Sequence, residues 1–202
     1  MKINTIKVIY ICPDHNDKYH KRKLHMDNLL TKIGFTNIEF YKSGTQNYPA
    51  CLIDATIDIL QNNLDEPIII LEDDVEWTGI DEIDNPESDA IYLGLSKCAG
   101  HPTENYDLGL GSIVFQKWSD SQVRILNMLS THAILYNSRQ YKLAVIETLL
   151  PYKNISYNSD VLISRIQPKF IVLGVKKPLF YQSSNFNATP DVEYCTKFEI
   201  NI

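Results

Sequence analysis

The stretch Pro67-Ile68-Ile69-Ile70-Leu71-Glu72-Asp73-Asp74 decides the fold of this 202-residue chain. A continuous apolar run is followed at once by three carboxylates. Such a run, without alternating polar side chains, is typical of a strand covered on both faces in a parallel sheet. In open α/β sheets, ligands bind beyond the carboxyl ends of these strands. The triplet therefore marks both the end of a central strand and a candidate site.

The sequence before this run predicts two strands and two helices. Residues 6–12 and 37–42 are rich in β-branched and aromatic side chains and are bounded by turn residues, as strands are. The helices are predicted from apolar residues spaced three or four apart. The first contains Met26, Leu29, Leu30 and Ile33 with Gly34 placed to cap it, and the second contains Leu52, Thr56, Ile59 and Leu60 and is entered through Pro49. The order βαβαβ predicts a parallel sheet with right-handed crossovers.

The sequence after the triplet predicts strands joined by connections too short for long crossovers, which indicates some antiparallel pairing. A helix with Leu143, Ile146 and Leu150 on its apolar face is closed by Pro151, and a shorter helix covers residues 161–166. The predicted strands are residues 90–95, 112–118, 132–136, 169–173 and 178–181. We therefore predict one α/β domain with a mixed sheet over residues 1–184 and a polar tail over residues 185–202.

Composition and charge narrow the class of protein. With 44% hydrophobic and 22% charged residues, the chain can bury a core. A net charge of −6 and a pI near 5.3 argue against broad binding to nucleic acid or anionic membranes. The chain shows no apolar stretch long enough for a signal peptide or a membrane span, and its four cysteines form no CxxC pair. The sequence therefore predicts a cytoplasmic protein without a zinc cluster or a disulfide framework.

The three adjacent carboxylates are the strongest candidate site. Like charges this close raise one another's pKa, so the cluster is costly unless a cation lies among them. In an extended chain, Glu72 and Asp74 point to one side and Asp73 to the other. Two oxygen ligands on one side suit Mn²⁺ or Mg²⁺, which complete their coordination with water and substrate phosphates. A solvated acidic turn is the alternative, and the buried run before the triplet favours the site.

The run Ile68-Ile69-Ile70-Leu71-Glu72-Asp73-Asp74-Val75 resembles the LILEDDV signature of the family-25-type glycosyltransferases, the lipopolysaccharide and collagen galactosyltransferase group. Further segments resemble the family's other motifs in the same order, and together they span residues 6–182. These segments are residues 8–12, Cys51, residues 131–138, residues 159–162 and residues 178–182.

This chain also departs from the family pattern. Asp54-Ala55 stands where the family has a Ser-His pair, and the loop after the first predicted strand is longer. Both departures indicate a divergent member whose donor sugar need not be galactose. In size and in its Lys-, Asn- and Ile-rich style, the chain is similar to glycosyltransferase domains encoded by large DNA viruses, which would place it in the host cytoplasm.

The resemblance implies a single GT-A-type, Rossmann-like domain with a mostly parallel sheet flanked by helices. It also implies a hexosyltransferase that moves a sugar from a nucleotide-diphosphate sugar, UDP-linked, to a hydroxyl of a glycan or glycoconjugate. The triplet would be a DxD-like motif in which Asp74 binds Mn²⁺ or Mg²⁺ directly. Glu72 would share the metal, and Glu72 or Asp73 would contact the ribose or a metal-bound water.

Asp160 is the candidate general base for the attacking hydroxyl. It follows two good helix-capping residues, Asn158 and Ser159, and precedes an apolar run. The helix dipole favours a carboxylate in the first turn with or without chemistry, and the family position favours catalysis. With Asp160 as base, the displacement is single and inverts the anomeric carbon. If Asp160 only orients the acceptor, the stereochemistry stays open.

Three further residues are candidates for donor binding. Pro13 and Asp14 follow the first predicted strand, where GT-A enzymes bind the base and ribose of the nucleotide. A plain Pro-Asp turn explains this pair equally well. His132 opens a predicted strand and could meet phosphate, metal or acceptor, although a lone histidine at a strand end is more often structural.

Two other functions stay open at the level of sequence. A nucleotidyltransferase shares the carboxylate pair and the metal, but it usually holds its triphosphate in a glycine-rich, basic loop, and residues 12–16 are not such a loop. A catalytically silent carbohydrate-binding module with the same fold predicts loss of the acids, which are intact here. The acceptor is left open, because acceptor loops fall in poorly patterned stretches such as residues 98–111.

Overall fold

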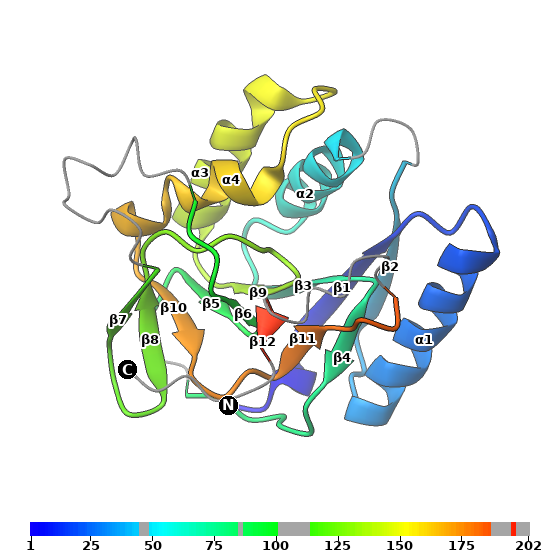
Figure 1. Ribbon diagram of the computed structural model, residues 1–202, viewed down its shortest axis with the longest axis horizontal. Helices are drawn as coiled ribbons and strands as arrows, with labels where there is room; N and C mark the ends of the chain where they lie inside the picture. The colour runs from blue at the N-terminus through cyan, green and yellow to red at the C-terminus, as the bar shows by residue number, and fades with distance from the viewer. Residues whose placement is uncertain (45–48, 85–86, 101–113, 187–194, 197–202) are drawn as a thin grey trace.

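The computed structural model of the protein describes residues 1–44, 49–84, 87–100, 114–186 and 195–196. These residues form a central sheet with helices packed against it (Figure 1). The helices are α1 (Asp17–Ile33), α2 (Ala50–Asn62), α3 (Arg139–Leu149) and α4 (Ser159–Ser164), with short 3-10 turns at Ile3–Thr5, Leu150–Tyr152 and Gln167–Lys169. The strands are β1 (Lys7–Cys12), β2 (Ile38–Lys42), β3 (Ile68–Glu72), β4 (Val75–Trp77), β5 (Ala90–Tyr92), β6 (Leu95–Ser96), β7 (Phe115–Lys117), β8 (Gln122–Ile125), β9 (Ala133–Tyr136), β10 (Val172–Val175), β11 (Phe180–Gln182) and β12 (Cys195–Thr196).

The first part of the chain is βαβαβ, as predicted. Strand β1 pairs in parallel with both β2 and β3. The register places Ile11 opposite Glu72 and Cys12 opposite Lys42, so the carboxyl ends of the three strands meet at one edge. The acidic triplet therefore lies beside the loop that leaves β1.

The whole sheet has eight strands among the described residues, in the order β2-β1-β3-β9-β5-β10-β8-β7. Strand β9 is antiparallel to β3 and β5, and β8 is antiparallel to β10 and β7. The other six strands run in one direction. The sheet is therefore mixed and mostly parallel, which confirms the predicted fold class.

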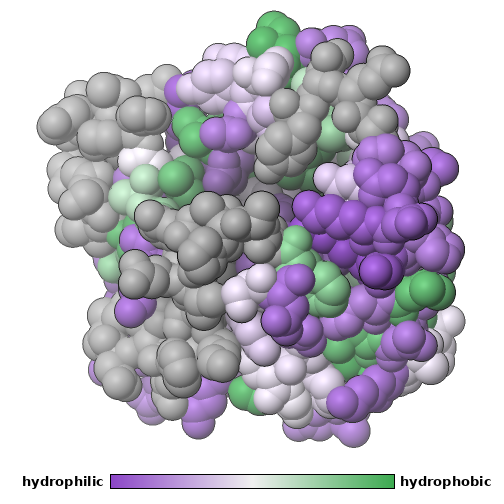
Figure 2. Space-filling model, turned by 45° about the vertical axis from the view of Figure 1, so that its right-hand side comes forward, coloured by the Kyte–Doolittle hydropathy of each residue, from purple (hydrophilic) through white to green (hydrophobic). Residues whose placement is uncertain are grey.

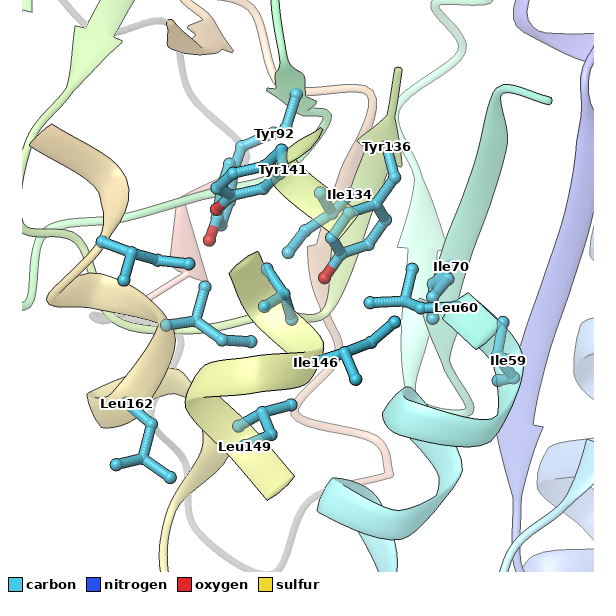
Figure 3. Close-up of a cluster of buried hydrophobic side chains, with 14 of the residues drawn as sticks. Ile59, Leu60, Ile70, Tyr92, Ile134, Tyr136, Tyr141, Ile146, Leu149 and Leu162 are labelled. Atoms are coloured by element: carbon cyan, nitrogen blue, oxygen red, sulfur yellow. The ribbon is translucent and has the colours of Figure 1, made fainter. Parts of the chain in front are cut away.

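Side chains of β3 alternate between two apolar cores on the two faces of the sheet. Ile68 and Ile70 belong to the core that α2, α3 and α4 cover, whereas Ile69 and Leu71 belong to the core beneath α1. Figure 3 shows part of the first core, in which Tyr92 and Tyr136 of the sheet and Tyr141 of α3 lie above Ile146 and Leu149. Burial on both faces explains why this strand is an unbroken apolar run.

Helix α1 begins and ends where its sequence indicates. The Asn16 side chain accepts hydrogen bonds from the backbone N–H groups of Lys18 and Tyr19, at 3.0 and 3.2 Å. Gly34 adopts a left-handed conformation with φ 88° and donates its N–H to the carbonyls of Leu30 and Thr31. The predicted glycine cap is confirmed, and it uses the positive φ that glycine adopts without strain.

The apolar face predicted for α3 is partly wrong. Leu143 and Leu150 are 36% and 51% exposed, while Val145, Ile146 and Leu149 are buried. The buried face is set by Tyr141, whose ring packs on Tyr136 and Phe170 with centroids 6.0 and 5.1 Å apart. The packing of an aromatic side chain near the start of α3, and not the spacing of the leucines, therefore sets which face of the helix is buried.

Several strands also differ from the prediction. Strands β4, β8 and β12 were not predicted, and β12 lies in the predicted tail, where it pairs with β6. Residues 169–171 precede β10 instead of forming part of it, because Pro168 lies in a 3-10 turn that ends at Lys169. Of the strand predicted over residues 112–118, the structure shows Phe115–Lys117, and residues 112–113 lie outside the described residues.

A buried lysine ties α3 to the end of α2. Lys142 is fully buried, and its Nζ donates to the carbonyls of Asn63, at 2.7 Å, and of Glu66. These carbonyls follow the last turn of α2, where backbone acceptors lack helical partners. The contact holds the two helices together on the face of the sheet where α4 also packs.

The outer surface agrees with the composition. Among the residues that Figure 2 colours, hydrophilic ones predominate and the hydrophobic ones form separated groups. Among the described residues, none of the helices has the length and apolar character needed to traverse a bilayer.

The division into a domain over residues 1–184 and a tail stays a prediction. The chain still contacts the domain at Phe186, whose carbonyl accepts a hydrogen bond from Arg22.

Candidate active site

Glu72 is the last residue of β3, and Asp73 and Asp74 form the turn to β4. The three side chains point to two different sides. Thr131 donates its hydroxyl to Glu72 Oε1 at 3.0 Å. The Gln182 amide lies 3.2 Å from Glu72 Oε2 and 3.4 Å from Asp74 Oδ1. Asp73 turns away and accepts a 2.7 Å hydrogen bond from Arg22 of α1. Glu72 and Asp74 therefore share one side, as predicted from the extended chain.

Arg22 is a buried cation that sequence analysis did not single out. Its side chain is 8% exposed, and the same nitrogen that binds Asp73 lies 3.9 Å from Asp74 Oδ2. Its other terminal nitrogen donates to the carbonyl of Phe186. A signal was present in the sequence, because Arg22 lies four residues before Met26 on the apolar face of α1. A basic residue on a buried helix face indicates an acidic partner.

The turn carries more negative charge than its partners offset. Burial and the nearby Asp74 charge raise the pKa of Glu72 to about 8, against the hydrogen bond from Thr131. Burial also raises the pKa of Asp74, although the Arg22 charge opposes it. Both carboxyl groups therefore resist ionisation. A bound cation would favour their charged form.

The donor set at this turn fits a hard divalent cation. Glu72 and Asp74 supply carboxylate oxygens, and the Gln182 amide nitrogen donates to both of them. Among the described residues, no group of three or more His, Cys, Asp and Glu side chains is arranged to hold a metal ion. Two carboxylates suffice for Mg²⁺ or Mn²⁺, which keep positions for water and phosphate oxygens.

A cavity of about 300 Å³ opens beside the turn. Both Glu72 and Asp160 line it. Segments far apart in the sequence meet here, from the start of α2 to the end of β11. The lining residues are Pro49, Leu52, Glu72, Ser96, Cys98, Leu129, Ser130, Thr131, Asn158, Ser159, Asp160 and Gln182.

Asp160 is held in place by backbone donors. Its Oδ2 accepts the N–H of Ser130 at 3.0 Å, and its Oδ1 accepts the N–H of Val161 at 2.8 Å. Ser130 has a positive φ of 80°, which is strained for a residue other than glycine. The strained residue aims its N–H at the carboxylate, so the loop before β9 orients Asp160.

His132 lies behind this loop and not in the cavity wall formed by the described residues. It is 1% exposed, and its Nδ1 is 2.6 Å from the hydroxyl of Ser130. A Cβ added to Gly94 would lie 1.9 Å from His132 Nε2, so this close approach requires glycine. The structure thus places His132 under Ser130, where it supports the loop that holds Asp160.

Pro13 and Asp14 follow β1 at the same edge of the sheet as the triplet. Asp14 has a positive φ of 41°, and its carboxylate lies 3.3 Å from His20 Nδ1 of α1. Neither residue is among the described residues that line the cavity. The structure therefore brings Glu72 and Asp160 together in the cavity wall and places Asp74 beside Glu72 through Gln182, whereas Pro13 and Asp14 lie outside the described lining.

Burial of His132 makes folding sensitive to acid. Burial lowers the pKa of His132 from 6.5 to about 4, so it stays neutral in the folded state where it would be protonated in the unfolded chain. Between these two values the unfolded state binds more protons, and the free energy of unfolding should fall as the pH falls. In the variant His132→Gln, we expect the slope of the free energy of unfolding with pH to be smaller than in wild type, by up to about 1.4 kcal/mol per pH unit.

Urea unfolding between pH 7 and pH 4.5 measures this dependence. His20→Gln serves as the matched control, because the His20 side chain is 63% exposed. Equal pH slopes for the wild type and His132→Gln would show that His132 does not carry the effect.

Neither a protein-family model nor a curated protein sequence matches this chain. Solved structures with a similar fold include a glycosyltransferase involved in the glycosylation of the major capsid of PBCV-1. It has a TM-score of 0.50 and 12% identity, with 83% of this chain and 80% of that chain covered. This likeness confirms the Rossmann-like, glycosyltransferase-type fold expected from the sequence. At 12% identity it shows the fold alone.

Two other solved structures have lower TM-scores. One is UDP-glucose pyrophosphorylase complexed with UDP-glucose, with a TM-score of 0.49, 12% identity and coverage of 88% of this chain and 76% of that chain. The other is CTP:phosphocholine cytidylyltransferase from Streptococcus pneumoniae, with a TM-score of 0.45, 8% identity and coverage of 92% and 96%.

Proposed function

We propose that the protein is a metal-dependent glycosyltransferase of the family-25 type. It would move a sugar from a nucleotide-diphosphate sugar, UDP-linked, to a hydroxyl of a glycan. One observation carries the proposal: a single cavity is lined by Asp160 and by Glu72, and the Gln182 amide that contacts Glu72 also lies 3.4 Å from Asp74. A transferase of this kind needs both groups, because it must neutralise a leaving diphosphate and deprotonate an attacking hydroxyl.

The carboxylates at the acidic turn and Asp160 have separate tasks in this proposal. Glu72 and Asp74 would hold Mn²⁺ or Mg²⁺, and the cation would supply positive charge to the diphosphate of the donor. Asp160 would take the proton of the acceptor hydroxyl. The N–H groups of Ser130 and Val161 hold the Asp160 carboxylate in place. A single displacement of this kind inverts the anomeric carbon.

The remaining candidates act around this centre. Pro13 and Asp14 would contact the base and ribose, since they leave β1 at the same sheet edge as the triplet. Asp73 and His132 are buried against Arg22 and Ser130, and we assign them positioning roles instead of donor contacts. Asp73 would hold the acidic turn in its split conformation, and His132 would support the loop that orients Asp160.

A ligand-binding screen by thermal unfolding tests the proposal. UDP, GDP, CMP and TDP sugars are added with and without Mn²⁺, and the shift of the unfolding midpoint is measured. Stabilisation by a nucleotide sugar only in the presence of Mn²⁺ is the expected result, because a ligand that binds the folded state raises its stability. The absence of a response to any nucleotide would contradict the proposal. Release of pyrophosphate from a nucleoside triphosphate and a sugar 1-phosphate would favour a nucleotidyltransferase instead.

A further inference from the structure

The cavity beside the acidic turn is polar, and the titratable carboxyl groups of its described wall have no basic side chain among them. Its charged lining residues are Glu72 and Asp160, and the described residues of its wall include no lysine, arginine or histidine. Hydroxyl and amide side chains make up most of the remaining polar wall. These are Ser96, Ser130, Thr131, Asn158, Ser159 and Gln182. Such groups can donate to and accept from the hydroxyls of a sugar ring.

Three basic residues that come near the site in the fold or in the chain are absent from its described wall. Arg22 lies on the other side of the acidic turn and pairs with Asp73. Arg165, at the end of α4, donates to the Tyr157 hydroxyl at 3.4 Å and does not belong to the described lining. Lys97 stands between two lining residues, but it is exposed and is likewise absent from the described wall.

The sequence outside the described residues adds little positive charge. Residues 45–48, 85–86, 101–113 and 187–194 contain no lysine or arginine. They contain four carboxylates instead, at Glu104, Asp107, Asp191 and Glu193. Residues 197–202 add one lysine and one glutamate.

We infer that this cavity accepts an uncharged sugar ring and rejects sugars that carry a carboxylate or a phosphate. The inference rests on the proposed function and specifies its substrate class. A volume of about 300 Å³ is at the lower end for small-molecule sites, which suits one ring and not a whole nucleotide sugar. A carboxylate on that ring would face Asp160 with no lysine or arginine in the described wall to offset the repulsion, even with a cation at Glu72 and Asp74.

Calorimetric titration with three probes tests this inference in the presence of Mn²⁺. The probes are UDP, UDP-glucose and UDP-glucuronic acid, which differ only in the group beyond the diphosphate. We expect UDP-glucuronic acid to bind at least about tenfold more weakly than UDP-glucose. Equal affinity for the two sugars would overturn this inference alone. Failure of UDP itself to bind would overturn the proposed UDP-linked donor and this inference with it.

A charge introduced into the wall gives a sharper test. Asn158 lines the cavity, and its side chain makes no capping hydrogen bond with the described part of α4, so Asn158→Lys should leave the helix intact. We expect this variant to raise the affinity for UDP-glucuronic acid, relative to that for UDP-glucose, by about tenfold over the wild-type ratio.

The matched control is Ile155→Lys, which adds the same charge at a residue that is 50% exposed and outside the described lining. Ile155→Lys should leave both affinities near the wild-type values. An equal gain for Ile155→Lys and Asn158→Lys would overturn the inference, because it would show only long-range attraction.

Discussion

Replacement of Asp74 by asparagine should abolish the Mn²⁺-dependent part of nucleotide binding. Asp74 is one of two carboxylates that face the Gln182 amide at the end of β3, and asparagine keeps its shape while removing the charge. A cation bound by two carboxylates loses much of its attraction when one becomes neutral. At a ligand concentration 100 times Kd, binding adds about 2.7 kcal/mol to stability, and this contribution should disappear in Asp74→Asn.

The metal-free stability of Asp74→Asn separates a functional carboxylate from a structural one. Burial raises the pKa of Asp74, and Asp74 in turn raises the pKa of Glu72, so the charged pair opposes folding at neutral pH. We expect the metal-free variant to unfold at a denaturant concentration no lower than wild type. A large loss of stability without any change in the Mn²⁺ response would show that Asp74 serves the fold and not the cation.

Glu76→Gln is the control for Asp74→Asn. It removes a carboxylate two residues further along, in β4, where Glu76 lies 4.0 Å from His25 on the side of α1. The Mn²⁺ response of this variant should match wild type, because the change in net charge is the same and the cation ligands are intact. A shared loss in both variants would indicate a general effect of charge.

Replacement of Asp160 by asparagine should leave nucleotide binding intact and stop sugar transfer. A well-placed general base contributes about 10²- to 10⁴-fold to the rate, so kcat should fall by that factor while the affinity for donor and Mn²⁺ stays within about threefold. Asparagine retains one acceptor oxygen, which can keep the N–H of Ser130, and it gives up the hydrogen bond from the N–H of Val161. The loop should therefore keep its conformation, and the loss should reflect the missing base.

Asp54→Asn is the matched control for Asp160→Asn. Asp54 also accepts a backbone N–H, that of Asn154 at 3.4 Å, but it lies outside the described lining of the cavity. Transfer should be unchanged in this variant. Normal transfer by Asp160→Asn would refute the assignment of the base, whereas loss of donor binding in Asp160→Asn would place Asp160 in the donor site.

Local features of the fold were predictable from the sequence because they depend on neighbouring residues. The glycine after Ile33 caps α1, and the apolar run of β3 is buried on both faces, as their patterns indicate. The division of the triplet, with Glu72 and Asp74 on one side, follows from the alternation of an extended chain. The apolar face of α3 was predicted less well, since its orientation depends on how Tyr141 packs against residues of other elements.

The contacts that complete the site could not be predicted from the sequence pattern. Thr131 is 59 residues from Glu72, Gln182 is 110 residues from it, and Arg22 is 51 residues from Asp73. His132 was a candidate for ligand contact, and the structure buries it beneath Ser130. Partnerships of this kind depend on which strands become neighbours in the sheet.

The sequence by itself determined that a central strand ends in three carboxylates and that the chain around it is an α/β domain with a mixed sheet. Hydrophobic periodicity and turn preferences depend on residues only a few positions apart, so they can be recognised in the local sequence. Only the tertiary structure decided that Asp160 and Glu72 line the same cavity and that its described wall is free of lysine, arginine and histidine. Those facts arise when segments far apart in the chain pack together, because burial and repulsion depend on distance in space.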